Sequence, residues 1–205
     1  MRVTSAEFLQ SSPGLDGCPP DDVPEFAFIG RSNVGKSSLL NLLTGKQGLA
    51  RVSQTPGCTQ LINFFKINGS FRMVDLPGYG YAKVPKGHRA AFQEIIAGYI
   101  ADRPNLQRVF VLLDSRHDPQ KIDLEFLEWL DEVERPFALV FTKTDKLKPS
   151  HVKKNTDSFL QALMAFHSAT PDVFLTSSKT RDGKREILGF IGGLLDASPE
   201  EKLFQ

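Results

Sequence analysis

Residues 30–37 read Gly-Arg-Ser-Asn-Val-Gly-Lys-Ser, which fits the pattern G-x-x-x-x-G-K-[ST]. The apolar segment 25–29 before it is typical of a short strand, and 36–43 after it has the apolar spacing of a helix. Glycines between a strand and a helix let backbone N–H groups point at phosphate oxygens, and the helix adds its positive end. The motif therefore predicts a phosphate-binding loop, and it restricts the chain to folds that join a strand to a helix in this way.

The polar residues of this loop have separate expected roles. Lys36 is expected to contact the β- and γ-phosphates as a point charge, and Ser37 to give its hydroxyl to Mg²⁺. A random chain of this length would match the pattern on the order of one time in a hundred, but a chance match need not fall between a strand and a helix. The predicted nucleotide contacts in the loop are Gly30, Arg31, Ser32, Asn33, Val34, Gly35, Lys36, Ser37 and Ser38.

Short apolar segments alternate with amphipathic ones along most of the chain, which is typical of parallel strands joined by helices. Asn68-Gly69 between two strand-like segments predicts a type I′ hairpin turn, because both central positions need positive φ. We therefore expect an α/β fold in three layers: a mostly parallel sheet with one antiparallel edge hairpin, and helices on both faces. The other predicted strands are 61–67, 71–74, 108–113, 137–141 and 173–175, and the other predicted helices are 89–101, 121–133, 151–166 and 185–195.

The length of 205 residues fits one domain with a sizeable core. Residues 1–23 are expected to form an N-terminal extension, in which the Pro-, Gly- and Asp-rich stretch 11–24 is a loop. Residues 24–197 are expected to form the nucleotide-binding domain, and 198–205 a C-terminal tail. Nothing in the pattern requires an oligomer, so we expect a monomer.

Charge and cysteine content set further limits. The net charge of +1 gives no overall field for nucleic acid, so such a partner would need a local basic patch. Two cysteines, Cys18 and Cys58, make no disulfide framework and indicate a reducing compartment. The longest apolar runs have strand length, far below the roughly 20 residues of a membrane span. We therefore expect a cytoplasmic protein without a membrane partner.

A carboxylate follows the strand-like segment 71–74. Asp75 is expected to hold Mg²⁺ through a water, and Gly78 to bring a backbone N–H to the γ-phosphate without a Cβ in the way. The alternative is an Asp that merely begins a Pro-Gly turn, and the phosphate loop upstream favours the first interpretation. Asp75, Leu76, Pro77 and Gly78 are all predicted nucleotide contacts.

A polar loop, 53–60, lies between the phosphate loop and this strand. A hydroxyl from it could coordinate Mg²⁺ only when the γ-phosphate is present, which would make an order–disorder switch. Thr55 and Thr59 are both candidates, and residue chemistry alone does not choose between them.

Two further polar segments follow predicted strands and are candidates for reading the base. The Asp145 carboxylate can accept hydrogen bonds from N1–H and N2–H₂ of guanine, and adenine lacks this pair of donors. The stem of Lys143 can pack along the base, and a backbone N–H of 177–179 can meet the guanine O6. The predicted contacts are Thr142, Lys143, Thr144 and Asp145, with Ser177, Ser178 and Lys179.

The motifs together resemble the translation-factor class of P-loop GTPases, and within it the EngB (YihA/YsxC) family of bacterial ribosome-assembly GTPases. The closer resemblance rests on 30–37, on Thr55-Pro56-Gly57-Cys58-Thr59-Gln60 leading into 63–65, and on Asp75-Leu76-Pro77-Gly78-Tyr79-Gly80-Tyr81. It covers about 24–195. It implies a cytoplasmic, Mg²⁺-dependent GTPase that acts late in assembly of the large ribosomal subunit and is linked to cell division and septation.

The resemblance also assigns residues that chemistry left open. It makes Thr59 the switch threonine, so the implied metal ligands are Ser37, Thr59 and Asp75. Gly57, Cys58, Thr59, Gln60 and Leu61 become nucleotide contacts, and Lys36, Asn33 and Gly78 the residues expected to act in hydrolysis.

The position after Gly78 departs from Ras-like enzymes, which place a water-orienting Gln there. Tyr79 cannot do that work in the same way, no intrinsic arginine finger is evident, and Arg31 is expected to face solvent. We therefore expect slow hydrolysis that a partner or an ion accelerates. Resemblance to potassium-activated GTPases implies that Asn33 helps to hold K⁺; the alternative is an Asn that only stabilises the loop.

Other functions remain open at this point. The chain could be a non-hydrolysing GTP sensor or RNA-binding module, or, less in keeping with Asp145, a P-loop ATPase or nucleotide kinase. Two basic runs are either solvated surfaces or contacts to ribosomal RNA. They are Lys83, Lys86, His88 and Arg89, and Lys143, Lys146, Lys148, Lys153 and Lys154.

Overall fold

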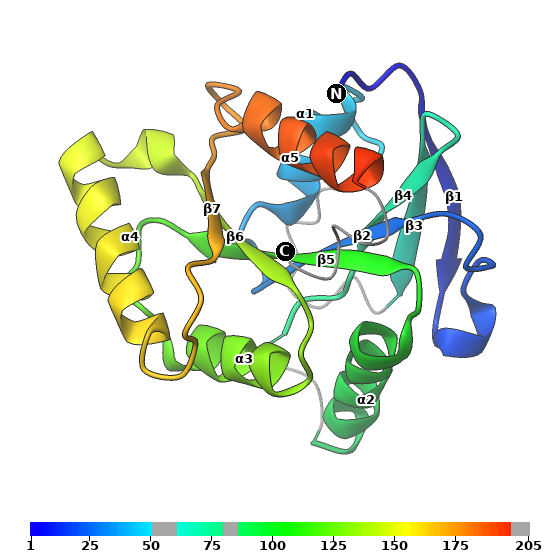
Figure 1. Cartoon of the computed structure of the whole chain (residues 1–205), viewed down its shortest axis with the longest axis horizontal. Helices are drawn as coiled ribbons and strands as arrows, with labels where there is room; N and C mark the ends of the chain where they lie inside the picture. Colours follow the sequence, from blue (N-terminus) through cyan, green and yellow to red (C-terminus); the bar gives the residue numbers. More distant parts are fainter. Residues whose placement is uncertain (51–60, 80–85, 198–205) are drawn as a thin grey trace.

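The structure is a computed structural model that describes residues 1–50, 61–79 and 86–197. Within these residues, seven strands form one sheet in the order β1-β3-β4-β2-β5-β6-β7 (Figure 1). The strands are β1 Ala6–Ser12, β2 Glu25–Gly30, β3 Ile62–Ile67, β4 Phe71–Asp75, β5 Leu106–Asp114, β6 Phe137–Thr142 and β7 Asp172–Leu175. The α-helices are α1 Lys36–Thr44, α2 Lys86–Asp102, α3 Lys121–Glu132, α4 Pro149–Leu163 and α5 Lys184–Asp196.

The predicted α/β architecture is confirmed. Strands β4, β2, β5, β6 and β7 are parallel neighbours, and β3 is antiparallel to β4. Asn68 and Gly69 join β3 to β4 with φ of 51° and 70°, the left-handed conformation that a type I′ turn requires. The predicted hairpin is therefore present.

The N-terminal segment differs from the prediction, which assigned no strand to it. Strand β1 pairs antiparallel with β3 and forms the edge of the sheet. Phe8 and Leu9 on this strand are exposed, and only its two end residues are buried, so the sequence lacks the alternation that marks a half-buried strand. Ser11 and Ser12, predicted to belong to a loop, lie in the strand.

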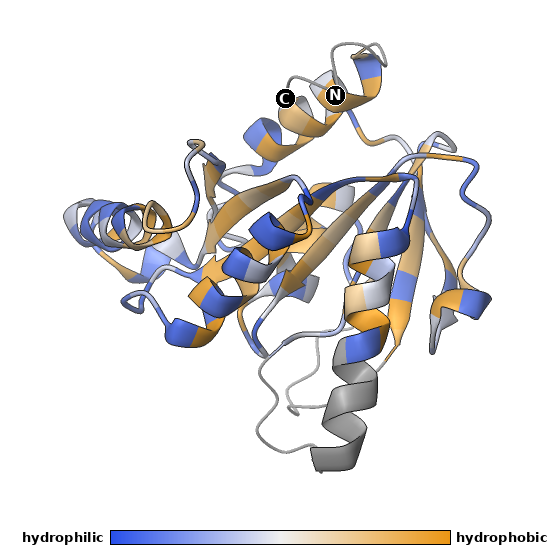
Figure 2. Cartoon of the chain, turned by 60° about the horizontal axis from the view of Figure 1, so that its bottom comes forward, coloured by the Kyte–Doolittle hydropathy of each residue, from blue (hydrophilic) through white to orange (hydrophobic). Residues whose placement is uncertain are grey.

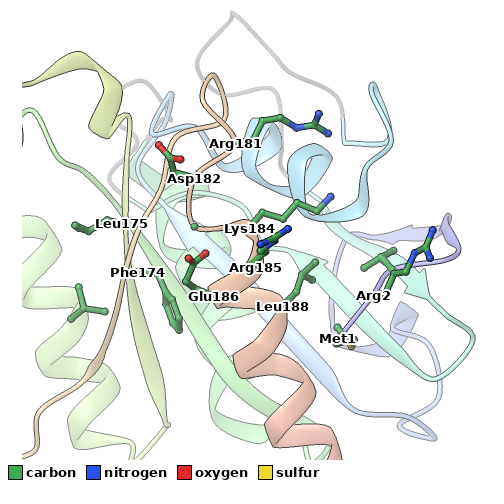
Figure 3. Close-up of a pocket in the computed structure, with 13 residues that line it drawn as sticks. Met1, Arg2, Phe174, Leu175, Arg181, Asp182, Lys184, Arg185, Glu186 and Leu188 are labelled. Carbon is green, nitrogen blue, oxygen red and sulfur yellow. The ribbon is translucent and has the colours of Figure 1, made fainter.

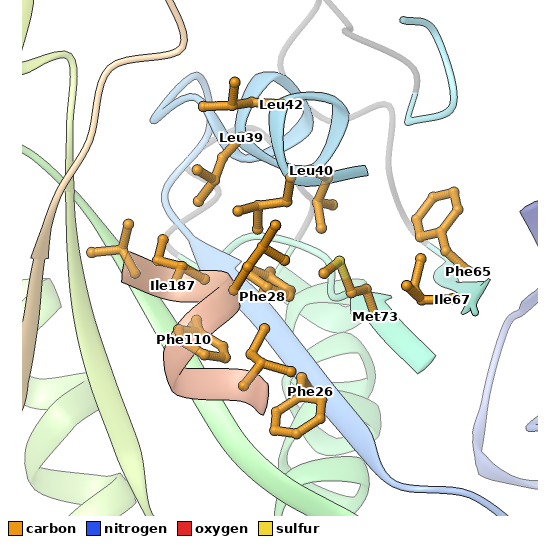
Figure 4. Close-up of a cluster of buried hydrophobic side chains, with 14 of the residues drawn as sticks. Phe26, Phe28, Leu39, Leu40, Leu42, Phe65, Ile67, Met73, Phe110 and Ile187 are labelled. Atoms are coloured by element: carbon orange, nitrogen blue, oxygen red, sulfur yellow. The ribbon is translucent and has the colours of Figure 1, made fainter. Parts of the chain in front are cut away.

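Helices cover both faces of the sheet. Helices α1 and α5 pack on one face, and α2, α3 and α4 on the other (Figure 1). Side chains of β2 alternate between the two sides, with Phe26 and Phe28 in the first cluster and Ala27 and Ile29 in the second. Figure 4 shows the first cluster below α1, and Figure 2 shows how apolar residues follow the central strands. Central strands buried on both faces read as continuous apolar runs.

A buried carboxylate ties the N-terminal segment to the start of β2. Glu25 is fully buried and accepts hydrogen bonds from Arg72, Arg103 and Tyr99. The same two guanidinium groups donate to the carbonyl oxygens of Pro20 and Pro19. This network lies at the amino end of β2, whereas the predicted site begins at the carboxyl end.

Candidate functional site

The phosphate loop joins β2 to α1, as predicted. Asn33 and Gly35 have φ of 62° and 111°, so the backbone turns twice through the left-handed region. Such turns gather N–H groups into a concave anion-binding surface. The first residue of α1 is Lys36, and Gly35 caps the helix without a side-chain hydrogen bond. The first N–H groups of α1 are therefore left for a phosphate.

Two residues expected to contact the base also donate hydrogen bonds to backbone carbonyls of this loop. The Thr142 hydroxyl donates to the carbonyl of Val34 at 2.6 Å. The Lys143 ammonium donates to the carbonyl of Asn33 at 2.7 Å and to Asp114 at 2.8 Å. Sequence reasoning missed Asp114, although its position as the last residue of β5 would have marked it.

The turn after β4 lies against the phosphate loop. Asp75 is the last residue of β4, and the N–H of Leu76 donates to the carbonyl of Phe28 at 3.0 Å. A Cβ on Gly78 would lie 2.6 Å from the carbonyl oxygen of Gly30, so only glycine allows this approach. Gly78 is thus beside Gly30, the first residue of the phosphate loop.

Lys36 and Asp75 meet at the centre of the site. The ammonium of Lys36 donates to a carboxylate oxygen of Asp75. Burial lowers the pKa of Lys36 to about 7, an effect that the neighbouring carboxylate opposes because it favours the charged form. The predicted phosphate contact Lys36 and the predicted metal ligand Asp75 are thus direct neighbours.

The donor set fits a magnesium ion that also binds phosphate oxygens. Ser37 and Ser38 are half-buried in the first turn of α1, and Asp75 supplies one carboxylate. In the described part of the chain, no three His, Cys, Asp or Glu side chains are grouped to hold a metal. A hydroxyl, one carboxylate and substrate oxygens are the usual ligands of Mg²⁺, which seldom has an all-protein cage.

The segments predicted to read the base lie side by side. The N–H and the hydroxyl of Thr144 both donate to the carbonyl of Thr176, at 3.2 and 3.1 Å. The Ser177 hydroxyl donates to Asp145 at 2.7 Å. This bond is the main cause that lowers the pKa of Asp145, so the group stays an ionised acceptor. Ser177 is buried, whereas Ser178 and Lys179 are exposed.

The switch loop cannot be compared with the structure. Thr55, Gly57, Cys58, Thr59 and Gln60 lie outside the described residues. Leu61, the last predicted contact of this segment, is exposed directly before β3.

Arg31 differs from the expectation, and Tyr79 contacts the same partner. Instead of facing solvent, Arg31 makes an ion pair with Asp123 of α3, with 3.1 Å between Nε and Oδ1. The Tyr79 hydroxyl donates to the same carboxylate oxygen at 2.9 Å. The sequence did not indicate this partner, because Asp123 reads as an ordinary polar residue of an amphipathic helix. Its contacts with Arg31 and Tyr79 join residues far apart in sequence.

The second basic run is only partly a free cationic surface. Lys143 pairs with Asp114, Lys146 with Asp145, and Lys153 with Asp157. Lys148 and Lys154 are exposed and have no ion-pair partner among the described residues. Of the first run, the structure describes no side chain.

A separate groove lies between α5, β7 and the N-terminus (Figure 3). Its walls include Arg2, Leu175, Arg181 and Lys184, and none of the predicted nucleotide contacts lines it. Among the helices of residues 1–50, 61–79 and 86–197, none is long and apolar enough to cross a bilayer.

Comparison with known proteins identifies the family. The family model described as "50S ribosome-binding GTPase" matches residues 25–143. The "Probable GTP-binding protein EngB" of Porphyromonas gingivalis is 52% identical over 194 residues, 95% of this chain and 96% of that protein. Its counterpart in Bacteroides fragilis is 51% identical over 191 residues, 93% and 95% of the two chains.

A solved structure agrees with these relatives. The crystal structure of a "probable GTP-binding protein engB" superposes with a TM-score of 0.68 at 25% identity, covering 83% of this chain and 98% of that one. Sequence and structure point to the same group of proteins. The chain therefore belongs to the EngB family of GTP-binding proteins.

Proposed function

We propose that the protein binds GTP with Mg²⁺, hydrolyses it slowly, and acts as a switch in late assembly of the large ribosomal subunit. The observation that carries the proposal is the direct link between the two halves of the site. Lys143 and Thr142 hydrogen-bond the phosphate loop, and the next residues place Asp145 beside Ser177. One rigid unit can thus bind the phosphates and test the base.

The proposed roles rest on the motifs and are supported by the geometry of the described residues. The loop N–H groups and Lys36 hold the β- and γ-phosphates, and the backbone of Gly78 contacts the γ-phosphate. Ser37, Asp75 and, from outside the described residues, Thr59 would hold Mg²⁺, which neutralises charge on the phosphate oxygens. Asp145 selects guanine. These residues lie within 24–197, the proposed nucleotide-binding domain, to whose sheet β1 is added.

Slow hydrolysis is proposed because the side chains beside the γ-phosphate turn, residues 76–79 after β4, already bind other groups. The Tyr79 hydroxyl donates to Asp123, and Arg31 pairs with the same carboxylate. Neither group is free to orient water or to act as an arginine finger. The same engagement supports the second candidate function, a non-hydrolysing GTP sensor or RNA-binding module.

Asn33 is proposed to help hold K⁺ near the phosphates. Its backbone carbonyl is taken by Lys143, and its side chain is exposed. The amide oxygen is thus left for an ion. A monovalent cation there would supply the positive charge that Arg31 does not.

The proposed partner is the large ribosomal subunit. We further propose that the protein is a cytoplasmic monomer and that it shares the family's link to cell division and septation. Support comes from the family description and from the exposed Lys148 and Lys154. Phosphate contacts by such cations weaken as salt is added.

Phosphate release from GTP tests the proposal, measured in KCl and NaCl at equal ionic strength, with and without purified large subunits. We expect slow basal turnover, faster turnover in KCl, and stimulation by the subunits. Equal rates in both salts would contradict the role of Asn33. Salt-sensitive binding to subunits without any turnover would favour the sensor instead.

A further inference from the structure

One buried carboxylate joins the phosphate loop to the γ-phosphate turn. The Asp123 side chain is 4% exposed and lies in the first turn of α3. Its Oδ1 is 3.1 Å from Nε of Arg31, a loop residue, and 2.9 Å from the hydroxyl of Tyr79, which follows Gly78. Burial raises the pKa of Asp123, and the Arg31 cation and the Tyr79 hydroxyl oppose this. The Arg31 cation and the Tyr79 hydroxyl therefore stabilise the charged form of the buried carboxylate, and the carboxylate in turn holds both side chains.

Tyr79 is also held through its ring. The ring stacks on Phe126, one turn further along α3, with centroids 4.4 Å apart and planes at 20°. A stacked aromatic pair contributes beyond the area it buries. Tyr79 is thus held at its ring and at its hydroxyl. Because Gly78 is the residue before it, this also restricts the position of the Gly78 backbone.

Gly78 has little freedom to move toward the loop. The position of its absent Cβ is 2.6 Å from the Gly30 carbonyl oxygen and 3.5 Å from the Ser32 backbone nitrogen. Anchoring Tyr79 therefore keeps the Gly78 N–H beside the phosphate loop before any nucleotide binds.

We propose that Asp123 is a positioning residue: through Tyr79 and Arg31 it holds the Gly78 turn against the phosphate loop, and so favours nucleotides that carry a γ-phosphate. The proposal rests on the proposed GTP-binding function and extends it to residues outside the motifs. A pre-placed N–H binds more tightly than one that must first be ordered, because the ordering entropy has already been lost on folding. GDP lacks the γ-phosphate, so it gains nothing from this placement.

The test compares the affinity of the full chain for GDP and for a non-hydrolysable GTP analogue in the presence of Mg²⁺. The Tyr79→Phe variant removes one hydrogen bond and keeps the stacked ring. We expect this variant to bind the analogue about 5- to 30-fold more weakly, which corresponds to the free energy of ordering roughly one residue. Its affinity for GDP should stay within about two-fold of that of the unmodified protein.

Tyr99→Phe is the matched control. Its hydroxyl donates to the buried Glu25 at 2.7 Å, the same type of bond at the other end of the sheet. This variant should leave the ratio of the two affinities unchanged. Asp123→Asn keeps an oxygen for Tyr79, so its effect on the ratio should be smaller than that of Asp123→Ala.

A double-mutant cycle adds an independent check. Arg31→Gln and Tyr79→Phe act through the same carboxylate, so their effects on the affinity ratio should not add. If Tyr79→Phe lowered the affinities for GDP and for the analogue equally, the inference would be overturned while GTP binding stands. The same holds if Tyr99→Phe changed the affinity ratio as much as Tyr79→Phe does. If the unmodified protein bound neither nucleotide, the proposed function would fail first, and the inference with it.

Discussion

Replacing Glu25 with glutamine should destabilise the protein strongly without altering its site. The carboxylate accepts four hydrogen bonds: from Arg72 at 3.1 Å, from Arg103 at 2.8 and 2.9 Å, and from Tyr99 at 2.7 Å. The Glu25 side chain is 0% exposed, and those of Arg72 and Arg103 are 7% and 12% exposed. In the Glu25→Gln variant, two buried guanidinium groups lose their shared negative charge, and the new amide NH₂ faces other donors.

The magnitude follows from breaking a buried ion pair. Removing one partner costs about 3–5 kcal/mol, and we expect about 3 kcal/mol because glutamine keeps one acceptor oxygen. For a domain of this size, each kcal/mol lowers Tm by about 2–4 °C, so Tm should fall by roughly 6–12 °C. Strand β2 separates Glu25 from the phosphate loop by about 16 Å, so nucleotide affinity well below Tm should not change.

Thermal and urea unfolding of the nucleotide-free protein measure this effect. Glu7→Gln is the matched control, because Glu7 is an exposed glutamate on the edge strand β1. A loss below about 1 kcal/mol would refute the reasoning, since that is the scale of a surface ion pair. Unfolding in two separate transitions would also contradict a single cooperative domain.

Three further variants test the site. Gly78→Ala places a Cβ 2.6 Å from the Gly30 carbonyl, so it should cost about 1–3 kcal/mol in unfolding free energy and weaken a GTP analogue more than GDP. Asp145→Asn exchanges an acceptor for a donor and should shift preference from guanosine to xanthosine nucleotides in competition binding; unchanged selectivity would contradict the base assignment. Burial acts to raise the pKa of Asp114, but bonds from Arg116 and Lys143 outweigh it and hold this pKa well below its ordinary value. Its stabilising contribution is therefore complete above about pH 4 and lost below it, so acid unfolding should be less pH-dependent in Asp114→Asn.

Much of the fold could be predicted because its central strands are buried on both faces. Strands such as β5 and β6 are continuous apolar runs, and Asn68-Gly69 marks the hairpin directly. Strand β1 could not be predicted, since edge strands with exposed Phe8 and Leu9 carry no alternation. Its pairing with β3 joins segments far apart in sequence, which a local sequence pattern does not indicate.

The site could be predicted where a motif fixes both residue type and spacing. The phosphate loop, Asp75 and Asp145 are such positions, and the structure puts each at the carboxyl end of a strand. The contacts of Arg31 and Tyr79 with Asp123 could not be predicted, because they join residues far apart in sequence on a loop, a turn and a helix. The bracing of the phosphate loop by Lys143 spans 110 residues and is likewise visible only in three dimensions.

Equilibrium binding of fluorescent GTP, GDP and ATP analogues, with and without Mg²⁺, tests the central claim most directly. The site built from the phosphate loop, Asp75 and Asp145 predicts tight binding of both guanine nucleotides, strengthened by Mg²⁺ for GTP, and no measurable binding of ATP. Equal or preferred binding of ATP would contradict the assignment of Asp145 as the guanine reader, and the proposed ribosomal function would fall with it.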